Sequence, residues 1–187
     1  MRLLVTGGSG FLGSELVQQA RAAGWEVVAT HATRPGVTAG TVPLDVTDPA
    51  AVEALIARTR PDAVVHTAYM LAGERLWPIT AEGPAHVARA AARHGARLVH
   101  LSTDLVFDGS RGGWSESDTP RPISPYGEAK AHAERAVAAA DPGALIVRTS
   151  LMLDSSLGPG PQEERALAAA RGELEMGFFE DELRTPV

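Results

Sequence analysis

The 187-residue sequence contains no cysteine and no asparagine. Without cysteine it can form no disulfide, thiol nucleophile or zinc–thiolate site, and without asparagine it has no N-glycosylation acceptor. Its apolar runs are too short for a signal-peptide core or a membrane span, and its net charge of -6 comes without a basic stripe. We therefore expect a cytoplasmic protein whose partner is neither a membrane nor a nucleic acid.

Lysine is also nearly absent, since Lys130 is the only lysine beside 16 arginines. It follows Tyr126 by four residues, so on a helix the two side chains share one face. An ammonium stabilises a neighbouring phenolate, so we expect the Tyr126 pKa to fall toward the range in which a phenol transfers protons. Arginine could not replace a compact, flexible ammonium in this role. An ordinary surface pair on an alanine-rich helix has the same spacing, so other motifs must decide.

The N-terminal segment predicts a dinucleotide site. A short apolar strand over residues 2–6 leads into glycines at 7, 10 and 13, and an amphipathic helix follows to about residue 24. In such a loop the first glycine allows a tight turn, the second admits a pyrophosphate, and the third lets the helix pack on the strand. The phosphates then lie at the positive helix N-terminus. A glycine turn without a ligand is the alternative.

Strands and helices alternate along the rest of the chain, whose 44% hydrophobic fraction is typical of one globular domain. Strands are predicted at residues 26–30, 42–46, 61–66, 97–101 and 144–149. Helices are predicted at residues 48–60, 79–94, from 125 onward, and at 162–172. This alternation predicts an α/β fold with a doubly wound parallel sheet. We expect an NAD(P)-binding Rossmann domain over 1–150 and a small or truncated substrate lobe over 151–187.

Two helix starts carry their own signals. Asp48 precedes Pro49, and Ser124 precedes Pro125. An aspartate or serine cap followed by proline in the first turn is a typical helix N-terminus. Near the other end of the chain a further strand is predicted at residues 174–179, and Phe178 and Phe179 there suggest core or interface.

The end of the second predicted strand favours NADP(H) over NAD(H). NAD sites of this kind place an acidic residue there to bind the ribose hydroxyls. In this sequence Thr30 and His31 occupy the position and Arg34 follows. A missing carboxylate and a nearby guanidinium suit a 2′-phosphate, although Arg34 could equally be a loop charge before Pro35.

The six histidines, at 31, 66, 86, 94, 100 and 132, have no metal-ligand spacing. We therefore expect no metal site. His66 and His100 stand at the ends of predicted strands. We expect them to be hydrogen-bonded residues at the edge of the core rather than acid–base groups.

With these motifs in this order, the chain resembles the extended short-chain dehydrogenases/reductases, and within them the dTDP-4-dehydrorhamnose reductase group of sugar-nucleotide-binding proteins. The segments that carry the resemblance are residues 6–13, 102–109, 124–130, 147–150 and 181–187. It implies an NAD(P)H-dependent reductase of a keto group on a (deoxy)sugar nucleotide, with a homo-oligomer as one compatible state.

The resemblance implies that Tyr126 donates a proton to the substrate carbonyl, that Lys130 holds the nicotinamide ribose, and that Thr103 polarises the carbonyl. The motifs and the resemblance together give as cofactor contacts Gly7, Gly10, Phe11, Leu12, Gly13, Thr30, His31, Arg34, Asp45, Val46, Ala68, Tyr69, Tyr126 and Lys130. The expected substrate contacts are Thr103, Asp104, Arg148 and Arg184.

Several features depart from the family pattern. Thr80 stands where many relatives have an asparagine that orders a water near the lysine, and Leu151 replaces a frequent aromatic residue. Relatives usually continue well beyond the position of Val187, so we expect a truncated substrate lobe. A non-catalytic NADP-binding regulatory subunit is therefore an alternative. A nucleotide-sugar epimerase or dehydratase is a further one, although a dehydratase usually has an acid where Leu105 follows Asp104.

Overall fold

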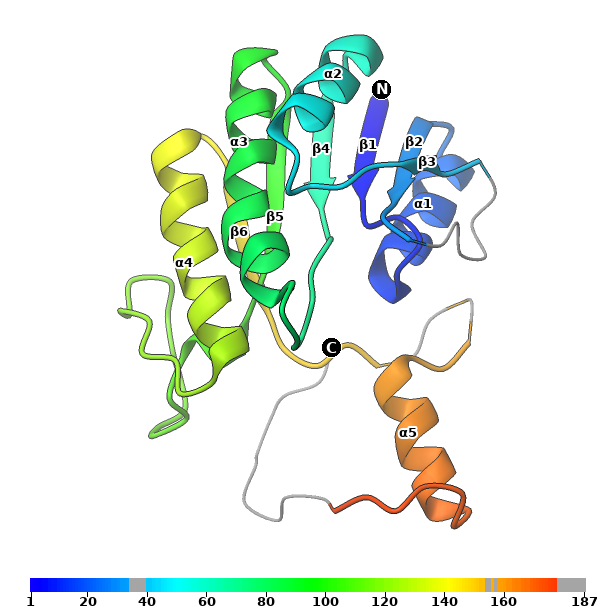
Figure 1. Cartoon of the computed structure of the whole chain (residues 1–187), viewed down its shortest axis with the longest axis vertical. Coiled ribbons are helices and arrows are strands. Elements are labelled where there is room, and N and C mark those ends of the chain that lie inside the picture. Colours follow the sequence, from blue (N-terminus) through cyan, green and yellow to red (C-terminus); the bar gives the residue numbers. More distant parts are fainter. Residues whose placement is uncertain (34–39, 154–155, 157, 178–187) are drawn as a thin grey trace. The chain divides into compact units, whose positions relative to one another are not determined.

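The computed structural model describes residues 1–33, 40–153, 156 and 158–177 (Figure 1). The chain divides into two compact units, Met1–Arg148 and Thr149–Val187. Arg34 and Arg184, two of the predicted site residues, lie outside the described residues, as do Phe178 and Phe179.

A six-stranded sheet with the order β3-β2-β1-β4-β5-β6 forms the centre of the first unit. Its strands are β1 (Arg2–Thr6), β2 (Glu26–His31), β3 (Val42–Pro43), β4 (Ala63–His66), β5 (Arg97–Thr103) and β6 (Leu145–Thr149). The ladders that join β3 to β2, β2 to β1, β1 to β4 and β4 to β5 are all parallel. The strand order reverses between β1 and β4, and ligands of such sheets bind at the carboxyl ends of the strands flanking this point. The predicted doubly wound α/β fold is confirmed.

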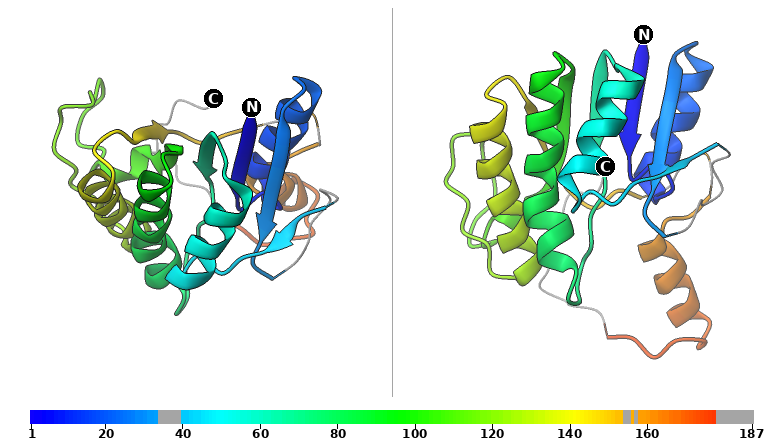
Figure 2. Two further views of the ribbon diagram at one scale, coloured as in Figure 1. Left: turned by 90° about the horizontal axis from the view of Figure 1, so that it is seen from above. Right: turned by 45° about the horizontal axis from the view of Figure 1, so that its top comes forward.

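Helices cover both faces of the sheet (Figure 2). One face carries α1 (Phe11–Ala22), and the other carries α2 (Pro49–Thr59), α3 (Gly83–Arg93) and α4 (Pro125–Ala140). Side chains alternate across a strand, so Leu3 and Leu4 of β1 enter two different cores. Leu3 packs in the cluster that contains Val17 of α1, and Leu4 packs in the cluster that contains Val87 of α3.

Both predicted helix caps are present. The Asp48 carboxylate accepts hydrogen bonds from the backbone N–H groups of Ala50 and Ala51, at 2.9 and 3.1 Å. The Ser124 hydroxyl accepts from Gly127 N at 3.1 Å. A cap of this kind contributes about 1 kcal/mol, and the one at Ser124 defines the first turn of the helix that carries Tyr126 and Lys130.

The third strand is shorter than predicted, ending at Pro43 rather than at residue 46. The reason is local, because the Asp45 carboxylate accepts from Thr47 N at 3.0 Å and from the Thr47 hydroxyl at 2.8 Å. Such a side-chain turn replaces the sheet ladder. The fifth strand is longer than predicted and continues to Thr103.

The helix predicted at residues 79–94 begins earlier and is irregular. A π-helix, η1 (Trp77–Glu82), precedes α3, and Gly83 N bonds to the carbonyl of Pro78, five residues back. Pro84 has no N–H group for the carbonyl of Thr80, so the regular four-residue ladder is interrupted at this point. π-Turns of this kind are frequent at functional sites.

The second unit contains helix α5 (Pro161–Ala170), where residues 162–172 were predicted to be helical. Its first turn is closed by a hydrogen bond from Gly160 N to the Glu163 carboxylate, at 2.7 Å. Residues 174–177 form no strand, so the strand predicted at 174–179 is wrong in this part, and its last two residues lie outside the described ones. In the described part of the chain no helix has both the length and the apolarity to cross a membrane.

Candidate active site

The glycine loop between β1 and α1 is as tight as its sequence predicts. Gly7 has a φ of 73°, and a Cβ there would lie 2.8 Å from Ala68 N. A Cβ on Gly13 would overlap the Gly7 carbonyl, which itself accepts a 2.9 Å hydrogen bond from Gly10 N. Gly10 caps α1 and has no side chain to occupy the first-turn N–H groups. The loop thus leaves the positive end of α1 open to an anion, as a bound pyrophosphate requires.

The segment after β4 forms the neighbouring wall. Thr67 is anchored to β1, because its backbone N–H and its hydroxyl both donate to the Thr6 carbonyl, at 3.1 and 2.8 Å. Ala68 therefore lies directly beside Gly7. Tyr69 follows with half of its side chain exposed, and partial burial raises its pKa. The structure brings these predicted cofactor residues together at the carboxyl ends of β1 and β4.

Thr30 and His31 occupy the end of β2. Thr30 is buried, and its hydroxyl accepts a hydrogen bond from Gly7 N at 3.3 Å. Thr30, which stands where an acidic residue would bind NAD, thus holds the glycine loop to the end of β2 through this hydrogen bond. His31 contacts the Thr41 hydroxyl through Nδ1 at 2.8 Å.

Asp45 forms an ion pair that the sequence did not predict. Its carboxylate accepts from the Arg75 guanidinium at 2.5 Å, and each side chain is about half exposed. Partial burial raises the pKa of Asp45, but hydrogen bonds from Thr47 and Arg75 outweigh it, so the pKa lies below its ordinary value. The pair links the segment after β3 to the segment after β4. Val46, the other predicted cofactor residue here, is buried in the core.

Thr103, Tyr126 and Lys130 come from two elements that pack against each other. Thr103 is the last residue of β5, and Tyr126 and Lys130 lie one turn apart at the start of α4. A Cβ on Gly127 would overlap the Leu105 carbonyl, so the glycine allows α4 to approach the end of β5 closely. The Thr103 hydroxyl accepts from Leu105 N at 3.2 Å and donates to Asp104 at 3.3 Å.

Lys130 is a buried ammonium under two phenol rings. Its Nζ lies 6.0 Å from the centre of the Tyr126 ring and 5.6 Å from that of Tyr69, and the two ring centres are 5.9 Å apart. Nζ donates to the Leu101 carbonyl at 2.8 Å, and the side chain is only 3% exposed. Burial lowers the Lys130 pKa to about 8, and the negative charge of Glu134 partly opposes this shift.

Two histidines lie beside this site within the sheet. His66 and His100 are paired in register on β4 and β5, and their rings stack at 5.4 Å. His66 Nδ1 contacts the Thr6 hydroxyl at 2.6 Å, but His66 Nε2 and both His100 nitrogens have no hydrogen-bond partner among the described residues. The expectation that both are hydrogen-bonded is therefore wrong for His100. In-register positions place the rings side by side on one face, so each imidazole packs on the other.

Glu134 is a site residue that the sequence interpretation missed. It is buried, its carboxylate accepts from the Ser102 hydroxyl at 2.5 Å, and the Arg148 guanidinium donates to it at 2.7, 3.0 and 3.2 Å. Arg148, predicted as a substrate contact, thus points its guanidinium at α4. The signal was available, because Tyr126, Lys130 and Glu134 follow each other at four-residue spacing on one helical face.

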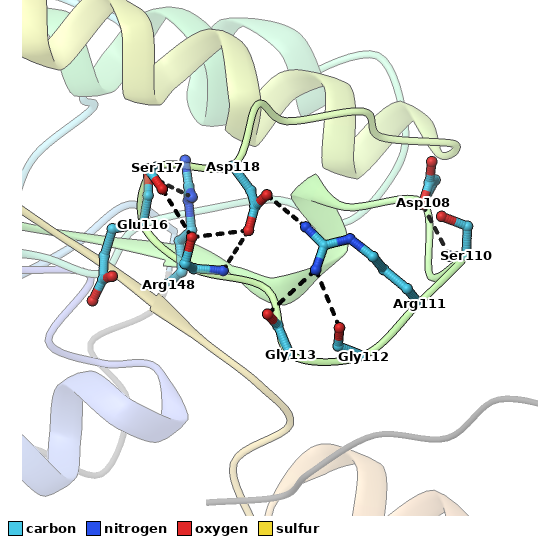
Figure 3. Close-up of polar contacts among 10 residues, drawn as sticks. Asp108, Ser110, Arg111, Gly112, Gly113, Glu116, Ser117, Asp118 and Arg148 are labelled. Atoms are coloured by element: carbon cyan, nitrogen blue, oxygen red, sulfur yellow. Dashed lines mark hydrogen bonds and ion pairs between the residues drawn. The ribbon is translucent and has the colours of Figure 1, made fainter.

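The Arg148 guanidinium also faces the loop that leads from β5 to α4. It lies 5.0 Å from the centre of the Phe107 ring, and Phe107 stacks on Trp114 at 4.4 Å with the planes 5° from parallel. The Arg111 guanidinium lies 3.9 Å from the centre of the Trp114 ring. Arg111 also pairs with Asp118 at 2.5 Å (Figure 3). This column of stacked side chains fixes the loop against Arg148 and so against Glu134.

No group of three or more histidine, aspartate or glutamate side chains suited to a metal ion occurs among the described residues. A glycine loop beside a Tyr–Lys helix, with a threonine at the end of the strand between them, is the arrangement of short-chain dehydrogenases/reductases.

Comparison with known proteins defines the group more closely. The family model described as RmlD substrate binding domain matches residues 1–187. The dTDP-4-dehydrorhamnose reductase of Mycobacterium tuberculosis is 36% identical over 188 residues, which cover 94% of this chain and 58% of that protein. The chain therefore belongs to this dTDP-4-dehydrorhamnose reductase-like family of extended short-chain dehydrogenases/reductases, and it spans 58% of the length of that relative.

Two further similarities bear on function. The methionine adenosyltransferase 2 subunit beta of Xenopus laevis is 32% identical over 164 residues, covering 81% of this chain and 47% of that protein. The crystal structure of dTDP-4-dehydrorhamnose reductase from Bacillus anthracis in complex with NADP superposes with a TM-score of 0.76 at 26% identity. It matches 91% of this chain and 60% of that one.

Proposed function

We propose that this chain carries the cofactor-binding and catalytic part of an NADPH-dependent reductase that acts on a keto group of a (deoxy)sugar nucleotide. One observation carries the proposal. The buried ammonium of Lys130 lies under the Tyr126 ring, at the carboxyl edge of the sheet where the glycine loop opens. Burying a charge costs free energy, and stabilisation of a tyrosine proton donor would account for this buried ammonium.

The residues divide the chemistry among them. Reduction of a ketone places a hydride on carbon and a proton on oxygen, and NADPH when bound supplies the hydride. Tyr126 donates the proton, and Lys130 stabilises the phenolate that remains. Thr103 donates a hydrogen bond to the same oxygen as negative charge develops there. Its present bond to Asp104, at 3.3 Å, is long enough to be exchanged for one to the substrate.

The described residues fit a dinucleotide. The uncapped first turn of α1 provides N–H groups for the pyrophosphate. Gly7 and Gly10 shape the loop that brings the phosphates to it. Ala68 and Tyr69 line the adjoining wall, and Lys130 would bind the nicotinamide ribose. Thr30 leaves the end of β2 without a carboxylate, which favours NADP(H), the cofactor bound to the Bacillus anthracis reductase. Arg34, Asp45 and Val46 would contribute on the adenosine side. Asp104 is proposed to contact the sugar, and residues 151–187 to begin the substrate lobe.

A second candidate is a non-catalytic NADP-binding subunit that regulates another enzyme. The similarity to the methionine adenosyltransferase 2 subunit beta supports it. The complete set of Thr103, Tyr126 and Lys130 favours the reductase, because a protein that only binds the cofactor needs no proton donor. An epimerase or dehydratase would use the same set, but Leu105 stands where a dehydratase has an acid.

NADPH oxidation measured with a panel of nucleotide 4-keto sugars tests the proposal, alongside calorimetric binding of NADPH. The reductase function predicts turnover with at least one sugar and its loss in Tyr126→Phe. Binding of NADPH without turnover for any of the sugars would support the regulatory subunit instead.

A further inference from the structure

We propose that Glu134 is a positioning residue of this site, whose fixed buried carboxylate lies one helical turn beyond Lys130 on α4 and keeps that ammonium charged. The inference rests on the proposed function for its catalytic meaning, but the electrostatic relationship can be measured without any cofactor or substrate.

The need for a negative charge follows from the surroundings of Lys130. The ammonium is buried, and its hydrogen bond to Leu101 goes to a neutral carbonyl. A buried ammonium without a compensating anion tends to lose its proton. The titratable groups that face it are Tyr126 and Glu134 on α4, Tyr69 after β4, His66 on β4 and His100 on β5. The neighbouring cation is Arg148 of β6, which is bonded to Glu134.

Of these groups, Glu134 is the carboxylate. The two imidazoles cannot take its place, because burial lowers the pKa of His66 to about 3 and that of His100 well below its ordinary value, so both are neutral near pH 7. A phenol is a neutral donor as long as it holds its proton. The charge that favours the ammonium therefore comes from one helical turn beyond Lys130.

The position of this carboxylate is determined by two strands. Ser102 of β5 donates to Oε1 at 2.5 Å, and Arg148 of β6 donates to both oxygens. Arg148 is in turn stacked against Phe107 at 5.0 Å. Because Ser102 precedes Thr103, the same carboxylate also anchors the strand end that carries the carbonyl-polarising hydroxyl. Through Ser102, Glu134 thus joins the helix that carries Tyr126 and Lys130 to the strand end that carries Thr103, without needing to touch the substrate.

An ion pair with Arg148 that served only stability would show the same contacts, so the test must measure Lys130 itself. Lys130 is the only lysine in the chain, and lysine labelled with ¹⁵N at Nζ and ¹³C at Cε therefore gives a single side-chain signal in NMR spectra. We expect its titration midpoint to be about 8 in the unmodified chain. In Glu134→Gln, which keeps the size but removes the charge, the midpoint should fall by about one pH unit.

Glu128→Gln is the matched control, because Glu128 lies exposed in the first turn of the same helix. In this variant the Lys130 midpoint should equal that of the unmodified chain. In Glu134→Asp, which keeps the charge, the Lys130 midpoint should return most of the way from its Glu134→Gln value to that of the unmodified chain. If Glu134→Gln does not fold because Arg148 is left unpaired, the double variant Glu134→Gln/Arg148→Gln is compared with Arg148→Gln. The Lys130 midpoint should be lower in the double variant, because the two variants differ only in the carboxylate. A midpoint unchanged in the folded variant would overturn the proposal.

The alkaline limb of the pH profile of NADPH oxidation gives the second measurement. It should move to lower pH in Glu134→Gln by the same amount as the NMR midpoint. A shifted NMR midpoint in a chain that reduces no sugar would refute the reductase function and leave the role of Glu134 intact. If the chain reduces a sugar but its Lys130 midpoint is unchanged in Glu134→Gln, the reductase function stands and the role of Glu134 is refuted.

Discussion

His66 and His100 stack face to face in the core, on neighbouring strands and with ring centres 5.4 Å apart. Burial depresses the pKa of both, to about 3 for His66 and well below its ordinary value for His100, and the Lys130 charge adds to each shift. Both imidazoles are consequently neutral in the folded chain at pH values where an unfolded chain already binds protons.

This relationship predicts acid-sensitive stability. Below about pH 6.5, the ordinary histidine pKa, the unfolded state binds more protons than the folded state. Stability should therefore fall as pH decreases toward 3, by about 1.4 kcal/mol per pH unit for each histidine. Urea unfolding at a series of pH values measures the slope. His66→Gln and His100→Gln should each flatten it, and a slope unchanged in both variants would contradict the prediction.

Replacing Tyr126 by phenylalanine should remove reduction while leaving cofactor binding within about twofold. Only the phenolic proton is lost, and a positioned general acid contributes about 10²–10⁴-fold in rate. Steady-state NADPH oxidation and calorimetric binding provide the two measurements. Tyr69→Phe, which alters the neighbouring ring, should keep most of the activity, and a Tyr126→Phe variant with near-normal turnover would refute the assigned mechanism.

Binding of an anionic cofactor near pH 8 should be accompanied by proton uptake. Lys130 is about half protonated at this pH because its pKa is about 8. The negative charge of the bound cofactor phosphates favours the protonated form. Calorimetry in two buffers of different ionisation enthalpy measures the uptake, which should vanish well below pH 7 and in Lys130→Met. Equal uptake in Lys130→Met would assign it to another group.

The glycine loop predicts a sharp difference between two alanine substitutions. Gly13→Ala should weaken NADPH binding at least tenfold and lower stability by about 1–3 kcal/mol, because its Cβ would overlap the Gly7 carbonyl. Gly112→Ala is the control, since a Cβ there meets no atom within 4 Å. Thermal unfolding and calorimetry distinguish them, and equal behaviour of the two variants would contradict the role of Gly13.

NADPH should bind more tightly than NADH. The end of β2 has Thr30 in place of a carboxylate, and its hydroxyl is engaged with Gly7 N, so it offers no acceptor pair to the ribose hydroxyls and no repulsion to a 2′-phosphate. Parallel calorimetric titrations measure both affinities. NADH binding as tightly as NADPH would show the preference to be wrong.

The fold could be predicted from short-range information. Alternating strands and helices, the caps at Asp48 and Ser124 and the glycine spacing depend on neighbouring residues alone, and the structure confirms each of them. The errors arose where a side chain competed with the backbone. The Asp45 turn ended β3 early, and Pro84 interrupted the helix that was predicted to start at Ile79.

The sequence by itself determined the doubly wound fold, the glycine loop and the Tyr126–Lys130 pair, because each depends on residues close together in the chain. On a helix, residues three or four apart lie on the same face. Only the tertiary structure decided which charges surround that pair. The pairing of Glu134 with Arg148, the stacking of His66 on His100 and the link from Asp45 to Arg75 join residues 14 to 34 positions apart. Electrostatic interactions depend on distance and burial in space. Helical spacing placed Glu134 on the face of Lys130, but it did not show which distant residue would pair with the carboxylate.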